Sequence, residues 1–303
     1  MSLFINWLES LSYELEAADS CVRKTSPFST CTVCIDSCEV QAITGAKGSL
    51  TIDHKLCTGC GRCVTVCPVQ ALMGESPKRK TLDGILLLDE GPLPTVNELL
   101  YLYKKGICTI YLPSEDELAS KTRLIIEEAN IQLTLMEKES FKITSSLTLS
   151  SAEKKLSRRD FFSKVTNDSK KYALASAAPA KWRFNQNHFN LAGMFPGWSF
   201  YSVGFETSCT LCETCFKLCP NGVFTLKDEN LEVNSEKCSG CMLCVDVCME
   251  KGMTISLEVT PSELQQKPVV KNECQTCGSN FPAWEGTDTC PICKKRKQLK
   301  FLF

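Results

Sequence analysis

Cysteine is the residue type that gives this sequence its chemistry. The chain has 21 cysteines among 303 residues, and most of them stand in short groups. Three groups share one spacing, with two, two and then three residues between successive cysteines: Cys57, Cys60, Cys63 and Cys67; Cys209, Cys212, Cys215 and Cys219; and Cys238, Cys241, Cys244 and Cys248. Thiolates at this spacing bind the iron atoms of [4Fe-4S] clusters.

A fourth group of cysteines is irregular. Cys31, Cys34 and Cys38 provide the later members of such a run, and we expect Cys21 to supply the missing thiolate from outside it. If Cys21 is not a ligand, a three-iron cluster is the alternative at this site. An offset of 181 residues carries seven cysteines of the first half, from Cys31 to Cys67, onto seven of the second half. The sequence therefore predicts a two-cluster unit that occurs twice.

Each unit resembles a bacterial two-cluster ferredoxin, in residues 18–78 and 204–258. In such units the last cysteine of each run binds the cluster of the other run. The resemblance implies four ligand sets: Cys21, Cys31, Cys34 and Cys67; Cys57, Cys60, Cys63 and Cys38; Cys209, Cys212, Cys215 and Cys248; and Cys238, Cys241, Cys244 and Cys219. It also implies a βαββαβ fold, and alternating apolar and polar residues at 49–53 and 230–234 predict two of its strands.

A second kind of metal site is predicted near the end of the chain. Two pairs of cysteines could hold a metal tetrahedrally: Cys274 and Cys277, then Cys290 and Cys293. The pattern resembles a zinc ribbon and also the rubredoxin-like tail of rubrerythrins, so a rubredoxin-type iron is the alternative to zinc. We favour zinc because the basic residues 294–296 follow the second pair where rubredoxins have small residues.

Residues 82–137 lie between the two units and lack cysteine pairs. Apolar segments at 84–88, 107–112 and 131–136 predict three strands. A helix is predicted after each of the first two strands, and a capping box at Ser114–Glu117 would open the second helix. This alternation indicates a small parallel α/β layer. Neither GxGxxG nor a P-loop follows these strands, and Cys108 is expected to be a packed residue.

We therefore expect an α+β protein with two ferredoxin-like modules, an α/β layer between them and a C-terminal zinc ribbon. The predicted parts are an amphipathic helix at 1–17, the first module at 18–81, the α/β domain at 82–137, a connector at 138–203, the second module at 204–258 and the ribbon-like tail at 259–303. Aromatic residues at the end of the connector are expected to be buried against a neighbouring domain.

Composition indicates no particular partner. The net charge is −1, so the chain as a whole offers no polycationic surface for nucleic acid. No apolar run is long enough to span a membrane, and the N-terminus lacks the layout of an export signal, which predicts a cytoplasmic protein. His54 and His188 are the only histidines, which leaves little material for acid–base catalysis.

The favoured interpretation is a non-catalytic electron carrier with four [4Fe-4S] clusters and one zinc. Resemblance to iron–sulfur subunits implies that it serves a larger oxidoreductase, and a molybdopterin enzyme is the favoured partner. Two alternatives stay open. One is an oxidoreductase that binds a cofactor in the central α/β domain, and the other is an iron–sulfur redox sensor that contacts nucleic acid through its basic tail.

Overall fold

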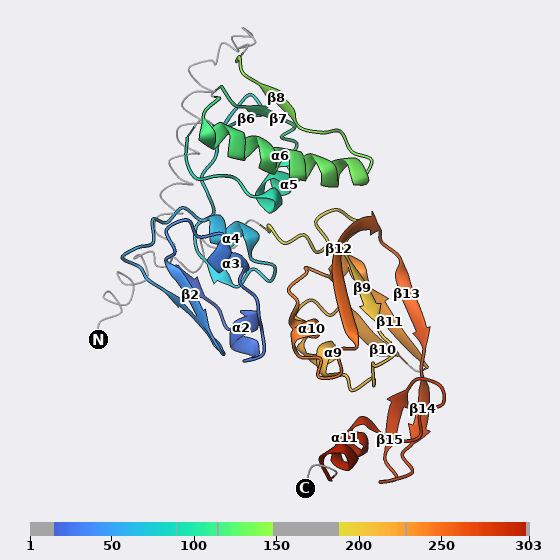
Figure 1. The fold of residues 1–303 in the computed structure, drawn as a ribbon. Coiled ribbons are helices and arrows are strands. Elements are labelled where there is room, and N and C mark those ends of the chain that lie inside the picture. Colours follow the sequence, from blue (N-terminus) through green and yellow to red (C-terminus); the bar gives the residue numbers. More distant parts are fainter. Residues whose placement is uncertain (1–14, 89, 114, 148–187, 228, 301–303) are drawn as a thin grey trace, which may run out of the picture.

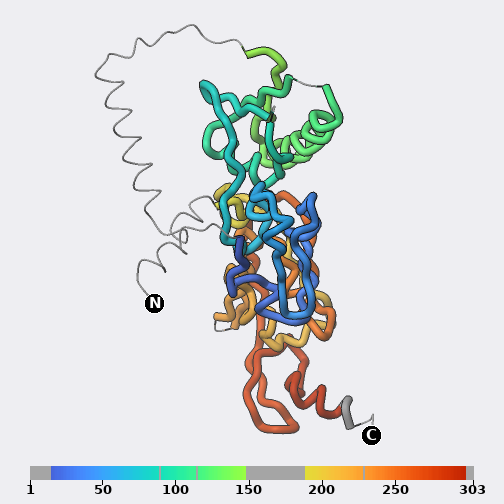
Figure 2. Tube along the Cα trace, turned by 90° about the vertical axis from the view of Figure 1, so that its left-hand side faces the viewer, coloured from blue at the N-terminus to red at the C-terminus, as the bar shows by residue number. Residues whose placement is uncertain are grey.

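The computed structural model describes residues 15–88, 90–113, 115–147, 188–227 and 229–300. Four parts follow one another along these residues: a first cysteine-rich unit, a central α/β unit, a second cysteine-rich unit and a C-terminal hairpin with one helix (Figure 1). Two views at right angles place the central unit and the C-terminal hairpin at opposite ends of the molecule, with the cysteine-rich units between them (Figure 1, Figure 2).

The first cysteine-rich unit combines two antiparallel strand pairs with short helices. Its elements are β1 (Glu16–Ala17), α2 (Val22–Thr25), α3 (Val33–Asp36), β2 (Ile43–Ala46), β3 (Ser49–Ile52), α4 (Arg62–Val66) and β4 (Leu72–Met73). Strand β1 pairs with β4, and β2 pairs with β3, which confirms the strand predicted at 49–53. The side chains of Leu15, Ile43 and Leu72 pack with the buried thiols of Cys34 and Cys63, so the cysteines belong to the core itself.

The helix predicted at 1–17 falls mostly outside the described residues. Its last two residues form strand β1 instead, because Glu16 and Ala17 pair with Met73 and Leu72. Leu15 is buried next to this pairing. The strand pair thereby joins the two ends of the first unit.

The second cysteine-rich unit has the same β-α-β-β-α-β order without a counterpart of α2, longer first and last strands of that order, and an added 3-10 helix and strand. Its elements are β9 (Trp198–Phe205), α9 (Thr214–Leu218), β10 (Phe224–Lys227), β11 (Asn230–Asn234), the 3-10 helix η1 (Ser235–Lys237), α10 (Leu243–Asp246), β12 (Met253–Pro261) and β13 (Leu264–Pro268). Strand β9 pairs antiparallel with β12, and β11 lies between β10 and β13. The strand predicted at 230–234 is confirmed by β11.

The central unit is a four-stranded sheet with two helices. Its elements are β5 (Lys80–Leu82), β6 (Ile85–Leu87), α5 (Val96–Lys104), β7 (Thr109–Tyr111), α6 (Glu117–Leu135) and β8 (Lys142–Thr144). The strand order is β5-β6-β7-β8, in which β6, β7 and β8 are parallel and β5 is antiparallel to β6. The expected parallel layer therefore carries one antiparallel edge strand.

The strand predicted at 131–136 is wrong, because this segment is the last part of helix α6. Ile126, Ala129 and Leu133 are fully buried at helical spacing, so the helix buries one continuous face through its final turns. The third parallel strand is β8. The N-cap of α6 is Asp116, whose carboxylate accepts a hydrogen bond from the Ala119 amide at 2.8 Å. Ser114 of the predicted capping box lies outside the described residues.

Residues 191–201 pack against the core of the central unit, and the last of them already belong to β9 of the second cysteine-rich unit. Phe195 and Phe200 are buried in the same core as Leu99 and Ile126, with their ring centroids 6.1 Å apart. The prediction that aromatic residues of this segment are buried is confirmed for both residues. The middle of the predicted connector, residues 148–187, lies outside the described residues.

The C-terminal part consists of a hairpin and a helix. Strands β14 (Val270–Glu273) and β15 (Asn280–Ala283) pair antiparallel, and α11 (Pro291–Lys300) follows. Its small core contains Phe281, Ala283 and buried cysteines. Among the helices described in the structure, none is both long and apolar enough to cross a membrane.

Candidate metal centres

The structure brings together the thiols that the sequence assigns to the second unit. One cavity is lined by the Cys238 set, which is Cys238, Cys241, Cys244 and Cys219. A second cavity is lined by the Cys209 set, which is Cys209, Cys212, Cys215 and Cys248. In both sets three cysteines come from the loop and first turn of one helix, and the fourth follows the other helix of the unit. The last cysteine of each run therefore lies with the first three cysteines of the other run.

The first unit has the same arrangement for one of its two sets. A third cavity is lined by the Cys57 set, which is Cys57, Cys60, Cys63 and Cys38. The remaining thiols are the Cys21 set, which is Cys21, Cys31, Cys34 and Cys67. Within this set Cys21 and Cys67 are buried around Ala71. Burial and then the charges of Cys67, Cys31 and Cys21 raise the pKa of Cys34 to about 12, so these four thiols are electrostatic neighbours.

The irregular spacing between Cys21 and Cys31 has a local structural cause. The inserted residues form the single helical turn α2, for which Cys21 is the N-cap residue. The Arg23 side chain donates a hydrogen bond to the carbonyl oxygen of Cys31 and a second one, of 3.3 Å, to that of Ala46. The insertion is therefore folded back onto the unit, and Cys21 is buried like Cys34 and Cys67, whereas Cys31 is half-buried.

A backbone amide reaches the sulfur of each run's last cysteine. The donor is always the residue four positions later: Ala42 to Cys38 at 3.3 Å, Ala71 to Cys67 at 3.2 Å, Val223 to Cys219 at 3.5 Å and Gly252 to Cys248 at 3.1 Å. The residue before each donor has a positive φ, which turns the amide back: Gln41, Gln70, Gly222 and Lys251. Only one of these four residues is glycine, so the residue types alone would not predict the four turns. Such hydrogen bonds stabilise thiolate ligands and tune cluster potentials.

The buried thiols would be costly to ionise without a cation. Burial, followed by the charges of neighbouring thiolates, raises the pKa of Cys63 and Cys215 to about 12. The pKa of Cys244 is raised for the same reasons. A cluster binds thiolates, and its iron atoms supply the positive charge that offsets this repulsion. The donor chemistry and the apolar cavities therefore fit iron–sulfur clusters.

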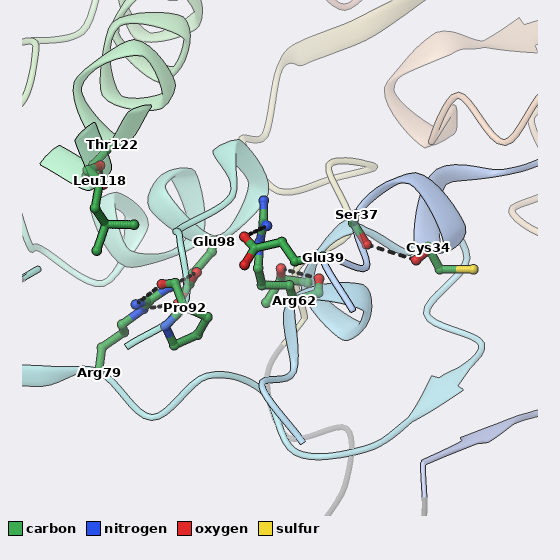
Figure 3. Close-up of polar contacts among 10 residues, drawn as sticks. Cys34, Ser37, Glu39, Arg62, Arg79, Pro92, Glu98, Leu118 and Thr122 are labelled. Carbon is green, nitrogen blue, oxygen red and sulfur yellow. Dashed lines mark hydrogen bonds and ion pairs between the residues drawn. The ribbon is translucent and has the colours of Figure 1, made fainter. Parts of the chain in front are cut away.

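Arg62 is a charged residue near the Cys57 set that no sequence pattern singles out. It lines the cavity with those cysteines, and its guanidinium forms an ion pair with Glu39 (Figure 3). Its side chain is 15% exposed, and its Nε is buried and has no hydrogen-bond partner among the described residues. A positive charge is thereby held close to this set in a partly desolvated position.

The four C-terminal cysteines form a compact site on the hairpin and α11. The sulfur atoms of Cys274, Cys277, Cys290 and Cys293 all lie within 4.8 Å of one another. The Cys290 amide donates to Cys274 Sγ at 3.3 Å, which lowers the pKa of Cys274. Tetrahedral zinc with Zn–S bonds of about 2.3 Å requires sulfur separations of roughly 3.8 Å. The separation of 3.9 Å between Cys277 Sγ and Cys290 Sγ fits this requirement.

Cys108 stands apart from all five sets. It is half-buried and directly precedes β7 in the central unit, and its carbonyl oxygen accepts a hydrogen bond from the Lys142 amide at 2.9 Å. This cysteine is placed to support the pairing of β7 with β8. Substitution of Cys108 is therefore a suitable control for substitutions of the cysteines in the five sets.

Family models match both cysteine-rich units. Residues 50–73 match the 4Fe-4S binding domain, and residues 204–249 match the 4Fe-4S dicluster domain. The chain therefore contains ferredoxin-type 4Fe-4S domains, which bind iron–sulfur clusters and transfer electrons.

Two curated proteins are similar to parts of the chain. One is AegA of Escherichia coli (strain K12), named as an oxidoreductase, with 31% identity over 86 residues, which is 28% of this chain and 13% of AegA. The other is a component of the ion-translocating oxidoreductase complex of Methanosarcina acetivorans, with 34% identity over 50 residues, which is 16% of this chain and 19% of that protein. The similarity thus spans less than a fifth of either relative.

Proposed function

We propose that the protein is an electron conduit with four [4Fe-4S] clusters in two ferredoxin-like modules. The main support is that three cavities in the cysteine-rich units are each lined by four thiols, three from one run and the fourth from the other run of the unit. All four thiols of each set would bind one cluster, so none of them would be free to bind a substrate. Such a cluster, when bound, accepts and releases one electron at a time.

In this proposal each set has one cluster and the chain controls its properties. The Cys57, Cys209 and Cys238 sets surround their cavities, and three of the four thiols of the Cys21 set are buried. Amides four residues after each run's last cysteine donate to sulfur, which favours the thiolate and stabilises the reduced cluster. Cys21 completes a four-iron site in place of the three-iron alternative.

We further propose that the C-terminal cysteines bind zinc as a structural metal. Four thiols at near-tetrahedral separations form a closed site, and three of them are buried. Zinc has no redox chemistry, so this part would hold the hairpin and α11 together and would not carry electrons. A rubredoxin-type iron is the alternative at the same ligands.

The proposed redox partners are inferred from the need of an electron carrier for a donor and an acceptor, and from the resemblance to iron–sulfur subunits. A conduit needs a donor and an acceptor, so we propose that the chain works as the iron–sulfur subunit or partner of a larger oxidoreductase. Support comes from the oxidoreductase names of the two partly similar proteins. A molybdopterin enzyme is the partner class that we favour by resemblance to iron–sulfur subunits.

Metal and sulfide analysis of anaerobically purified protein, with EPR during reduction by dithionite, tests the proposal. About sixteen iron atoms and one zinc per chain, with spectra of coupled pairs of reduced clusters, are expected. About seventeen iron atoms and no zinc would replace the zinc assignment by a rubredoxin-type site. About eight iron atoms after careful reconstitution would overturn the four-cluster conduit.

A further inference from the structure

The two cysteine-rich units are joined by a specific polar contact. Asp246, at the end of α10 in the second unit, accepts two hydrogen bonds from Thr30 of the first unit, one from the amide and one from Oγ1, both 2.8 Å long. Helices α2 and α10 lie on the facing sides of the two units (Figure 1). The contact uses both oxygens of one carboxylate and thereby fixes orientation as well as distance.

Apolar residues of the first unit complete this junction. Val22 of α2 is buried in the core of the second unit, where it packs with Leu243 and Val247 among others. Cys31 and Val69 also lie against that core. The two units therefore share one packed interface and are not connected by the chain alone.

The junction places one thiol of each unit close together. Cys31 of the Cys21 set and Cys241 of the Cys238 set pack against the same core. Thr30, which makes the contact with Asp246, directly precedes Cys31 in the chain.

Inside each unit the two sets are neighbours as well. Cys34 of the Cys21 set is buried in the same small core as Cys63 of the Cys57 set, and Cys38 and Cys57 pack against that core. In the second unit, Cys215 of the Cys209 set is buried in the same core as Cys238 of the Cys238 set, and Cys244 packs against that core. The Cys21 set lies at the junction through Cys31, whereas the cavity of the Cys57 set is lined by residues of the first unit alone. In the second unit the cavity of the Cys209 set is bordered by Pro291 and Ile292 of the C-terminal part, so this set lies at the end away from the junction.

We propose that the four clusters form one unbranched chain in the order Cys57 set, Cys21 set, Cys238 set and Cys209 set, and that the Thr30–Asp246 contact positions the step between the two units. This inference rests on the proposed four-cluster function. The rate of electron transfer falls steeply with distance. Because the junction is packed, electrons would pass between the units through the clusters of the Cys21 set and the Cys238 set. Asp246 is a positioning residue, because it acts through the backbone next to Cys31.

The order gives the molecule two separate ends for electron exchange. Near the Cys57 set, Leu56 and Val40 are exposed apolar residues, and Val40 lines the cavity. Near the Cys209 set, Met249 and Ile292 are exposed and line the cavity of that set. Donor and acceptor can therefore contact opposite ends of the chain of clusters and need not compete for one surface.

The variant Asp246→Ala tests the junction, since it removes both hydrogen bonds to Thr30. One electron per chain is added rapidly, and its distribution is followed by freeze-quench EPR. We expect an unchanged iron content, unchanged potentials of the two outer clusters, and loss of the fast phase that moves the electron between units. Thr30→Val removes one of the hydrogen bonds from the other side and should slow the same phase without abolishing it.

Asp36→Ala is the matched control. Asp36 accepts a hydrogen bond from Thr32 at 2.7 Å, but both residues belong to the first unit, so this variant should transfer electrons between units like the wild type. An unaltered fast phase in fully loaded Asp246→Ala and Thr30→Val proteins would overturn the proposed junction while leaving the conduit intact. A wild-type iron content of about eight would instead overturn the conduit and, with it, the four-cluster chain.

Discussion

Arg79 and Glu98 form a buried, bidentate ion pair. Arg79 lies in the segment that follows the first cysteine-rich unit, and Glu98 lies in helix α5. Arg79 Nε donates to Glu98 Oε1 at 2.7 Å and Nη2 to Oε2 at 2.9 Å, while Nη1 donates to the carbonyl oxygen of Pro92 at 2.7 Å (Figure 3). The side chains are only 6% and 3% exposed. The N-cap of the same helix, Thr95, also contacts Thr65 of α4 at 2.8 Å. Two polar contacts thus attach the central unit to the first unit.

Replacement of Arg79 by Ala should destabilise the central unit strongly. It leaves the Glu98 carboxylate buried without its cation, which costs about 3–5 kcal/mol. The measurement is the thermal unfolding midpoint by circular dichroism at a fixed scan rate, and a fall of about 10 °C is expected. Glu90→Gln is the control, because the ion pair of Glu90 with Lys80 is exposed to solvent and should contribute little to stability.

A double variant separates the lost charge from the lost packing. Arg79→Met with Glu98→Leu removes both charges and keeps apolar volume, so much of the stability should return. A midpoint as low as that of the single Arg79→Ala variant would show that the hydrogen bonds themselves, including the one to Pro92, hold this junction. An unchanged midpoint in Arg79→Ala would contradict the role of the ion pair altogether.

The cysteine sets could be predicted from the sequence because ligand spacing is a local property. Three thiols from one short loop lie together whatever surrounds them, and the fourth thiol that lines each of the three cavities agrees with the resemblance to two-cluster ferredoxins. The strands at 49–53 and 230–234 were equally local, since each alternates apolar and polar residues next to a turn. In these regions a few neighbouring residues determine the structure.

The predictions that failed depend on packing between distant segments. Ile131, Leu133 and Leu135 alternate with polar residues and suggested a strand, but Ile131 and Leu135 are 61% and 52% exposed on helix α6. The true third parallel strand, β8, has a half-exposed Ile143 and little apolar signal. The Arg79–Glu98 and Thr30–Asp246 contacts join residues that no sequence pattern relates.

The variant Cys67→Ser tests how the two runs of the first unit exchange their last cysteines. Because Cys67 is buried with Cys21 around Ala71, we expect loss of the cluster at the Cys21 set, with iron falling by about four atoms per chain. The EPR signal that disappears should be the one that Cys31→Ser removes. If it is instead the signal removed by Cys60→Ser, the assignment is wrong. Cys108→Ser should retain all signals, since Cys108 lies outside the sets.

Arg62 should raise the reduction potential of the cluster at the Cys57 set. Its partly buried cation lines that cavity and favours the added electron. Arg62→Gln is expected to lower this potential by on the order of 50 mV, with little change at the other clusters, in an EPR-monitored redox titration. Lys78→Gln is the control, because the Lys78 side chain is 83% exposed and its charge is screened by solvent. Equal shifts in both variants would show a general charge effect and contradict the local role of Arg62.

Removal of the C-terminal metal should unfold the hairpin and α11 and leave the iron content unchanged. The core of this part is little more than Phe281, Ala283 and three cysteines, which is too small to be stable without a metal. Cys293→Ser should therefore abolish the protection of residues 270–300 in hydrogen–deuterium exchange, while Cys108→Ser preserves it.

Trp284 donates a hydrogen bond to the carbonyl oxygen of Cys209 at 2.9 Å, so loosening of this part should also expose the Cys209 set. Its cluster should then be oxidised by air faster than the cluster of the Cys57 set, which lies in the other unit. Retained protection in a zinc-free Cys293→Ser protein would show that the hairpin and α11 fold without the metal.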